Sequence, residues 1–291
     1  MARASRPRDG ASGRLVLVGT PIGNLGDLSP RAVEALRTAT LICCEDTRRT
    51  GRLLQHAGVP APRLAVCNEH TEPARIAEVL ATLGEGGDVA VVTDAGSPGI
   101  SDPGERVVRA VIDAGFDVTT VPGPTALVTA LVTSGLPTGR FVFEGFLPRS
   151  GRARAERLAD LAGERRTIII YEAPHRVVRT LGDLAKTFGE DRPVVVAREL
   201  TKLWETIVRG RLGDIDLGEP RGEYVLVIAG AQDPAGPPDD DAIRLALRAE
   251  LAGGATTRDA ATAVARRLGV PKRLVYALAV SEGHRSGTIE P

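Results

Sequence analysis

The chain has 291 residues, of which 43% are hydrophobic and only 3% aromatic, with 37 basic and 37 acidic side chains. This length and composition predict about two domains whose cores are mainly aliphatic. The zero net charge argues neither for nor against binding of nucleic acid, so any such binding must come from local clusters of cations.

No apolar run approaches the length needed to cross a bilayer, and the first twelve residues lack the apolar core of a signal peptide. The three cysteines, Cys43, Cys44 and Cys67, do not have the spacing of a zinc site. Cys43 and Cys44 are neighbours on a predicted strand, so their side chains should point to opposite faces. We therefore expect a cytoplasmic protein with reduced cysteines, no membrane contact and no metal.

Residues 1–13 are expected to form a disordered tail, followed by an α/β domain over residues 14–144. Short apolar runs predict strands at 15–18, 41–44, 64–66, 89–92 and 118–121. Amphipathic segments predict helices at 30–38, 47–57, 73–83, 105–114 and 125–134. Ser29 is the expected N-cap of the first helix. This alternation of strands and helices predicts a parallel sheet with crossover helices.

Residues 145–151 contain two glycines and a proline and are predicted to link this domain to a second α/β domain over residues 152–231. The second domain is predicted to have helices at 152–161 and 176–188 and strands at 167–171, 194–197, 205–209 and 224–229. Because the last three strands have no long helices between them, we expect a mixed sheet.

Residues 232–240 are rich in proline, glycine and aspartate and form a second predicted linker. Helices predicted at 242–251, 257–268 and 272–281 make a helical module over residues 241–285, in which Thr256 or Thr257 can cap the middle helix. The tight joint at residues 269–271 is typical of a helix-turn-helix, while a plain helical cap or a dimerisation hairpin is the alternative.

The most informative segment is the loop from Asp94 to Gly104, which contains three glycines and two prolines and follows the strand at 89–92. Glycines let the backbone approach a ligand closely, and prolines fix the shape of the loop in advance. Loops at the carboxyl edge of a parallel sheet are where α/β proteins bind ligands. The sequence therefore predicts an enzyme with a small-molecule site built from loops.

Four further segments accompany this loop: Gly19–Leu25, Glu45–Arg48, Pro122–Ala126, and Tyr171–Arg176 together with Arg198–Lys202. With Asp94–Gly104, the set resembles the tetrapyrrole methylase superfamily over about residues 14–230, and more closely the branch that modifies ribosomal RNA. The resemblance implies two α/β domains with S-adenosylmethionine (SAM) in the cleft between them, followed here by the small C-terminal helical module. It also implies a homodimer that transfers a methyl group to the ribose 2′-oxygen of a decoding-region cytidine in 16S rRNA of the small ribosomal subunit.

SAM carries no phosphate, so its site does not need a glycine-rich phosphate loop. The resemblance assigns the cofactor side to Pro21, Asp94, Gly96, Ile100, Ser101, Asp102, Thr125 and Ala126. The backbone of the Asp94 loop could hold the methionine moiety, or Asp94 could simply close an Asx turn. Thr125 can cap the following helix and face the ligand at the same time.

Methyl transfer is an in-line displacement, so the protein mainly aligns the reacting atoms. A ribose hydroxyl is a poor nucleophile at neutral pH and benefits from a base or an acceptor. The candidates for catalysis are Glu45, Asp46, Arg48, His70, Glu172 and His175. Asp46 with Arg48 is either an acid with its orienting cation or a helix N-terminal acid with a nearby cation. The sequence does not assign the base, and alignment alone could suffice.

Local RNA contacts are expected from Arg149, Arg152, Arg154, Arg176 and Lys202, and further basic residues lie in the C-terminal helices. The alternative for all of them is an ordinary solvated helix face. Two rival functions remain open: a C-methyltransferase of a tetrapyrrole, and a regulatory RNA-binding protein that binds SAM without turnover.

Overall fold

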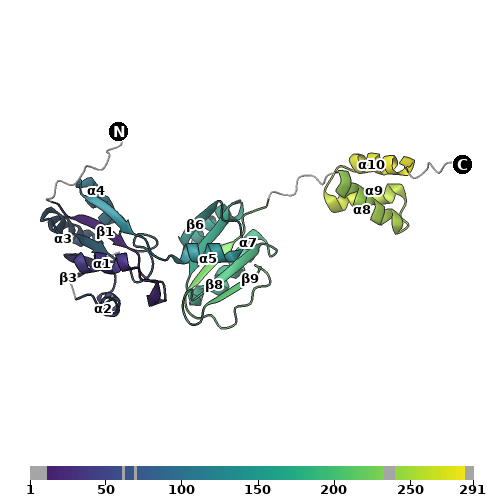
Figure 1. Ribbon diagram of the computed structural model, residues 1–291. Helices are drawn as coiled ribbons and strands as arrows, with labels where there is room; N and C mark the ends of the chain where they lie inside the picture. Colours follow the sequence, from purple (N-terminus) through teal and green to yellow (C-terminus); the bar gives the residue numbers. More distant parts are fainter. Residues whose placement is uncertain (1–11, 61–62, 69–70, 233–239, 286–291) are drawn as a thin grey trace. The chain divides into compact units, whose positions relative to one another are not determined.

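The structure is a computed structural model that describes residues 12–60, 63–68, 71–232 and 240–285. The chain forms two compact units, residues 1–231 and residues 232–291, and the first unit contains two five-stranded sheets (Figure 1). Most of the expected N-terminal tail lies outside the described residues. Gly13, its last residue, is buried and donates its amide to the carbonyl of Leu83 at 2.9 Å.

The first sheet is entirely parallel and has the strand order β3-β2-β4-β1-β5. Its strands are β1 (Arg14–Val18), β2 (Leu41–Cys44), β3 (Arg63–Val66), β4 (Val89–Val91) and β5 (Asp117–Val121). The crossover segments contain a 3-10 turn, η1 (Leu25–Asp27), and the helices α1 (Pro30–Thr38), α2 (Thr47–His56), α3 (Glu72–Gly84) and α4 (Glu105–Asp113). As predicted, the Ser29 hydroxyl caps α1 by accepting the amide of Ala32 at 3.1 Å.

Alternate side chains of these strands face two separate helical layers. Val16, Ile42 and Cys44 pack against α1 and α2, whereas Leu15 and Cys43 pack against α3 and α4. This two-sided burial explains why the strands are continuous apolar runs. It also confirms that the neighbouring cysteines point to opposite faces, where both are free thiols.

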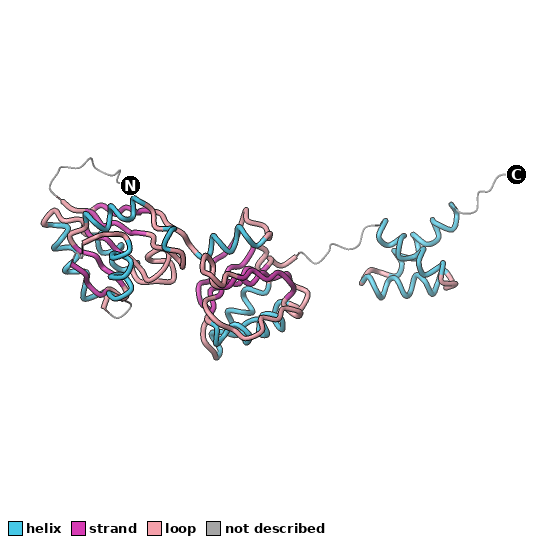
Figure 2. Tube along the Cα trace, turned by 60° about the horizontal axis from the view of Figure 1, so that its bottom comes forward, coloured by secondary structure: helices cyan, strands magenta, loops and turns pink. Residues whose placement is uncertain are grey.

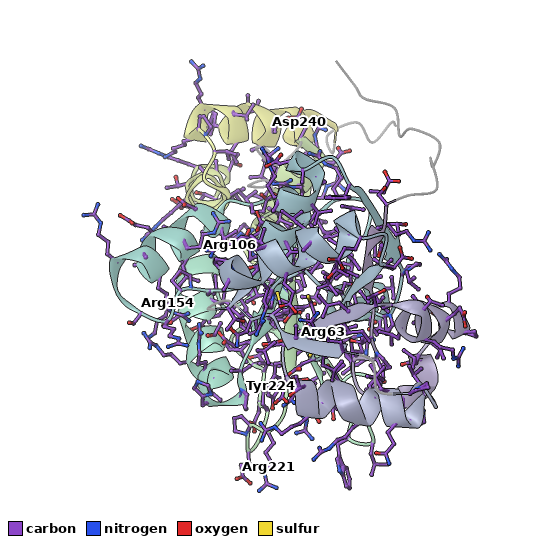
Figure 3. The ribbon with its side chains drawn as sticks, turned by 90° about the vertical axis from the view of Figure 1, so that its left-hand side faces the viewer. Arg63, Arg106, Arg154, Arg221, Tyr224 and Asp240 are labelled. Atoms are coloured by element: carbon purple, nitrogen blue, oxygen red, sulfur yellow. The ribbon has the colours of Figure 1, made fainter. Side chains whose placement is uncertain are left out.

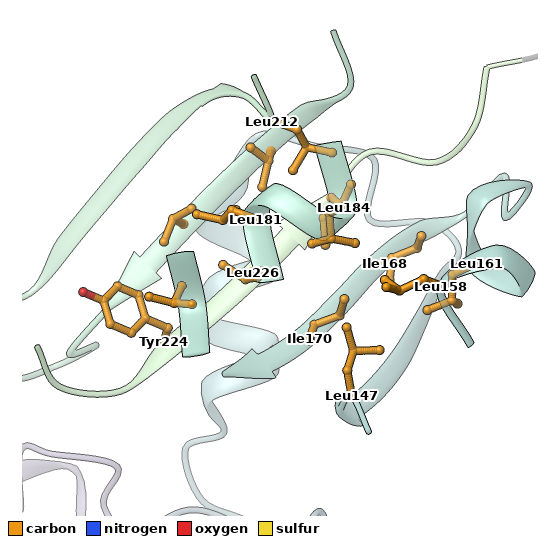
Figure 4. Close-up of a cluster of buried hydrophobic side chains, with 14 residues drawn as sticks. Leu147, Leu158, Leu161, Ile168, Ile170, Leu181, Leu184, Leu212, Tyr224 and Leu226 are labelled. Atoms are coloured by element: carbon orange, nitrogen blue, oxygen red, sulfur yellow. The ribbon is translucent and has the colours of Figure 1, made fainter. Parts of the chain in front are cut away.

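The second sheet is mixed, as expected, with the strand order β6-β7-β10-β8-β9. It contains β6 (Phe141–Phe146), β7 (Thr167–Glu172), β8 (Pro193–Arg198), β9 (Thr206–Arg211) and β10 (Tyr224–Ile228). The pair β6–β7 is parallel, and the other pairs are antiparallel. On one face, α6 (Gly151–Ala162) and α7 (Pro174–Phe188) cover a core that includes Ile168, Ile170 and Leu226 (Figure 4).

The boundary between the two sheets lies earlier than the sequence predicted. Residues 141–146 form β6 of the second sheet, so the first sheet does not extend to residue 144 and residues 145–151 are not simply a linker. Gly145 has φ +58° and lies at an irregularity of the β6–β7 pairing, so its backbone freedom serves a bulge rather than a domain link. Helix α5 (Ala126–Ser134) also packs on the second sheet, with Ala130 and Leu131 in its core.

The second unit is a bundle of the helices α8 (Asp240–Ala252), α9 (Thr257–Leu268) and α10 (Lys272–Arg285), drawn in cyan in Figure 2. They bury a common core that includes Ile243, Val264 and Val275. Thr256 caps α9 by accepting the amide of Asp259 at 3.2 Å. Most of the preceding predicted linker lies outside the described residues. None of the helices in the described ranges is long and apolar enough to span a membrane.

A buried polar network joins α6 and α7 to the end of β7. Arg154, labelled in Figure 3, has only 4% of its surface exposed. Its guanidinium donates to Asp183 at 2.9 Å, to the Thr180 hydroxyl at 2.9 Å and to the carbonyl of Pro148 at 3.0 Å. Because all these donors are used inside the protein, the structure contradicts the predicted contact between Arg154 and RNA.

This network predicts that Arg154→Ala lowers the free energy of unfolding by about 2–3 kcal/mol, because the partly buried Asp183 carboxylate and the buried Thr180 hydroxyl lose a partner. Arg152 lies on the same helix but is exposed, and among the described residues it pairs only with Glu156. Arg152→Ala should therefore change stability by less than about 0.5 kcal/mol. Urea denaturation followed by circular dichroism compares the two, and equal stabilities would contradict the assigned role of Arg154.

Candidate functional site

Three loops meet at the carboxyl edge of the first sheet because β1 lies between β4 and β5. The loops after β1 and β4 are joined by a pair of hydrogen bonds between Thr20 and Gly96, at 2.8 and 3.1 Å. The loops after β1 and β5 cross at Gly19 and Gly123, where a Cβ on Gly19 would lie 2.6 Å from the Gly123 nitrogen. Only glycine allows this approach, which brings the three loops into one place.

The loop from Asp94 to Gly104 contains residues with positive φ angles, and a side chain from another part of the chain holds its end in place. Gly96 has φ +82° and Ser101 has φ +61°. Residues other than glycine rarely adopt such positive φ angles. At its far end, the buried Glu72 side chain accepts the amides of Gly104, Arg106 and Val107 through one oxygen, at 3.0–3.1 Å. Glu72 thereby caps α4 in place of Gly104, which has no side chain to do so.

A cavity of about 410 Å³ lies between these loops and the second sheet. Its lining includes all of the following predicted cofactor residues: Asp94, Gly96, Ile100, Ser101, Asp102, Thr125 and Ala126. Pro21 lines a smaller adjoining cavity instead. The second sheet and the segments next to it contribute further lining residues that the sequence did not assign to the cofactor: Phe146, Tyr171, Pro174, Ala197 and Leu200.

Tyr171 connects the two sides of the cavity. Its hydroxyl accepts the amide of Leu127 in the first turn of α5 at 3.0 Å, and its ring packs edge-on against Phe143 and Phe146. Thr125 occupies the N-cap position of α5, but its side chain makes no capping hydrogen bond, contrary to expectation. The sequence could have indicated Tyr171 as a site residue, because it lies near the end of a strand that was predicted.

One wall of the cavity is acidic. Glu45, Asp94 and Asp102 all line it, and Glu45 accepts the Thr93 hydroxyl at 3.3 Å. Burial, with the nearby charge of Glu45, raises the pKa of Asp102 to about 6 and also raises that of Asp94. Such a group of carboxylates favours a cationic ligand, since the ligand's charge would relieve their mutual repulsion.

Asp94 also has an oxygen that the protein leaves without a partner. Its Oδ2 pairs with Arg49 at 3.2 Å, an ion pair that the sequence did not reveal. Its Oδ1 is buried and accepts no hydrogen bond within the described part of the chain. A buried acceptor of this kind is costly unless a ligand satisfies it, so Asp94 is placed to bind a hydrogen-bond donor.

Glu172, a predicted catalytic residue, is committed to the fold. Its Oε1 accepts the amide of Ala173 at 2.9 Å and pairs with Arg176 at 3.1 Å, while its Oε2 accepts the Thr180 hydroxyl at 2.6 Å. Glu172 lines the cavity, but both of its carboxylate oxygens are occupied by these internal partners. His175 is exposed and lines neither cavity, and His70 lies outside the described residues.

Asp46 and Arg48 form a local pair at the start of α2. Asp46 caps the helix by accepting the amide of Arg48 at 2.8 Å, and the Arg48 guanidinium lies 3.1 Å from its other oxygen. The side-chain hydrogen bond from Arg48 lowers the pKa of Asp46 to about 2. This placement favours the structural alternative, because a carboxylate with so low a pKa accepts a proton poorly.

The remaining predicted RNA contacts differ in their availability. Arg149 and Arg152 are exposed, whereas Arg176 donates to the carbonyl of Leu147 at 2.7 Å and pairs with Glu172. Lys202 pairs with Glu199 at 2.9 Å and with Glu223 at 2.8 Å. Across the described segments, no three histidine, cysteine or carboxylate side chains gather as metal ligands would.

The site and the fold both have known counterparts. The sequence profile of the Tetrapyrrole (Corrin/Porphyrin) Methylases matches residues 14–216. Ribosomal RNA small subunit methyltransferase I of Synechocystis sp. is 47% identical over 273 residues, which cover 92% of this chain and 98% of that protein.

Two solved structures share the fold at low identity. The methyltransferase CobJ is 23% identical with a TM-score of 0.58, over 76% of this chain and 95% of its own. The uroporphyrin-III C-methyl transferase of Thermus thermophilus, complexed with S-adenosyl homocysteine, is 20% identical with a TM-score of 0.52, over 75% and 97%. As its motifs predicted, the chain belongs to the tetrapyrrole methylase family of methyltransferases and groups with its ribosomal RNA small subunit methyltransferase I members.

Proposed function

We propose that this chain is a SAM-dependent methyltransferase of ribosomal RNA. We further propose that it works as a homodimer and methylates the ribose 2′-oxygen of a decoding-region cytidine in 16S rRNA. The name of the relatives that match almost the whole chain supports the rRNA substrate. The main support for SAM as the methyl donor is the cavity, which has one acidic wall and a buried carboxylate oxygen without a partner.

The cavity fits SAM in charge and in polarity. SAM has a sulfonium and an ammonium group, and the carboxylates of Glu45, Asp94 and Asp102 offset these positive charges. The unpartnered Oδ1 of Asp94 can accept a hydrogen bond from the ammonium group or from an acceptor hydroxyl. Apolar lining residues such as Leu200 and Val225 suit the adenine ring.

SAM supplies a methyl carbon bonded to a sulfonium, which an oxygen nucleophile can attack directly. The chain's own task is to hold the acceptor oxygen in line and to receive its proton. Three carboxylates that line the cavity could do this, Glu45, Asp94 and Asp102, because Glu172 is held by internal donors and Glu223 pairs with Lys202. The raised pKa of Asp94 brings it closer to neutrality, where a general base works best.

The second candidate function is C-methylation of a tetrapyrrole. The fold shared with uroporphyrin-III C-methyl transferase favours it, and Arg49 in the cavity lining would also suit a carboxylate of such a substrate. It is the weaker candidate, because that likeness is at 20% identity whereas the rRNA methyltransferase relative is 47% identical.

The first prediction here is that labelled methyl from SAM enters small ribosomal subunits taken from a strain that lacks this enzyme. The label should survive as an alkali-resistant dinucleotide, because a methylated 2′-oxygen cannot assist cleavage of the neighbouring phosphate. Free 16S rRNA and uroporphyrinogen III are tested side by side. Label only in the tetrapyrrole would favour the second candidate, and SAM binding without any transfer would favour a regulatory protein.

The affinity for SAM should depend on pH. Asp102 has a raised pKa of about 6, so its charge is present above this pH and is lost below it. A bound cation favours the charged form, and SAM affinity should therefore fall about tenfold between about pH 7 and about pH 5. Calorimetric titration measures this fall, and Asp102→Asn should bind SAM weakly with little dependence on pH.

Asp113→Asn is the matched control, because Asp113 is an exposed carboxylate at the end of α4. It should retain the wild-type profile. S-adenosyl homocysteine, which lacks the sulfonium charge, should lose less affinity at low pH than SAM. An Asp102→Asn profile equal to that of the wild type would overturn the role of Asp102.

A further inference from the structure

A second cavity, of about 340 Å³, adjoins the first. It lies between the loop that follows β1 and one face of α2, which contributes Arg49, Arg52 and Leu53. These three positions are spaced so that their side chains share one side of the helix. The two cavities have Ile22, Asp94 and some neighbouring residues in common, so they share a wall.

The second cavity combines an apolar surface with cations. Pro21, Ile22, Leu25 and Leu53 provide the apolar part. Leu25, which lies in the 3-10 turn η1 at the edge of this cavity, is 45% exposed. A cavity that combines an apolar lining with a few charged groups is typical of a ligand site.

The three cations of this cavity differ in their partners. Arg49 pairs with Asp94, and Lys202 pairs with Glu199 and Glu223. The Arg52 side chain is exposed and forms no hydrogen bond or ion pair with any described residue. The cavity therefore presents one free guanidinium, which can bind an anionic oxygen without breaking an existing contact.

We infer that the second cavity receives the acceptor nucleotide, with its base against the apolar surface and its phosphate on Arg52. This inference rests on the proposed function and specifies its substrate side. A nucleotide joins a flat, weakly polar ring to an anionic phosphate, which matches an apolar surface beside one free cation. The shared wall places the ribose between the two cavities, next to the unpartnered oxygen of Asp94.

Other ligands fit this cavity less well. A tetrapyrrole has several carboxylates, and a single free cation would leave most of them without a partner. A free phosphate would not use the apolar surface. Because bases in structured RNA are stacked, the nucleotide would have to leave its stack to enter, as it does in other enzymes that act on single bases.

The test measures methyl transfer from saturating labelled SAM to unmodified small subunits at increasing subunit concentration, with the full chain. Arg52→Ala should raise the KM for subunits about tenfold, because it removes a charged contact to phosphate. It should also lower the slope of log KM against log salt concentration by about one. Its affinity for SAM should stay at the wild-type value, because Arg52 does not line the first cavity.

Arg31→Ala is the matched control, because Arg31 is an exposed helical arginine of the same sheet unit that lines neither cavity. It should leave both KM and the salt dependence unchanged. Leu25→Ala tests the base contact separately. It should raise KM as well but leave the salt slope as in the wild type, since no charge is removed.

The outcomes separate the two levels of the proposal. If Arg52→Ala has the same KM and the same salt slope as Arg31→Ala, the second cavity does not receive the acceptor nucleotide. The proposed methylation of rRNA would be unaffected by that result. Loss of SAM affinity in Arg52→Ala would also overturn the acceptor site, because the two cavities would then not have separate roles. If the wild-type chain labels no RNA, the proposed function itself fails, whatever the variants do.

Discussion

The site depends on one constraint, the contact of backbone with backbone between Gly19 and Gly123. The loops after β1 and β5 approach so closely there that a single methyl group would collide with the opposite chain. The paired hydrogen bonds between Thr20 and Gly96 then attach the β4 loop to the same place. A parallel sheet brings strand ends to one edge, but these contacts turn that edge into a continuous wall. Ile22 extends the wall by packing into the core of the second sheet, which closes the cavity from the other side.

The acidic residues near the cavity divide into two groups by the number of donors that surround them. Glu72 and Glu172 each accept several hydrogen bonds in the interior and hold helix ends in position. Asp94 and Asp102 have few donors and raised pKa values, so they are the ones with capacity left for a ligand. Carboxylates whose hydrogen-bonding capacity is filled by the protein thus hold the helix ends in position. Those with capacity left form the proposed cofactor wall.

Sequence patterns predicted much of the fold because the first sheet is buried on both faces and each strand is a short apolar run. The family resemblance assigned Asp94, Asp102 and Thr125 to the cofactor side, and all three line the cavity. The sequence patterns missed β6, because the glycine of a bulge resembles the glycine of a linker. They also assigned Arg154 to RNA and Glu172 to catalysis, since spacing along the chain does not show that two distant polar side chains are buried together. The sequence could not predict the ion pair of Arg49 with Asp94 for the same reason.

The central claim is that SAM binds in the cavity between the two sheets. Amide hydrogen exchange of the full chain with and without SAM tests it most directly, because ligand contacts slow local opening of the backbone. The account predicts slower exchange in residues 94–104, at the start of α5 and along β10, with no change in the helices of residues 240–285. Unchanged exchange in those segments, or slower exchange only in the helical unit, would contradict it.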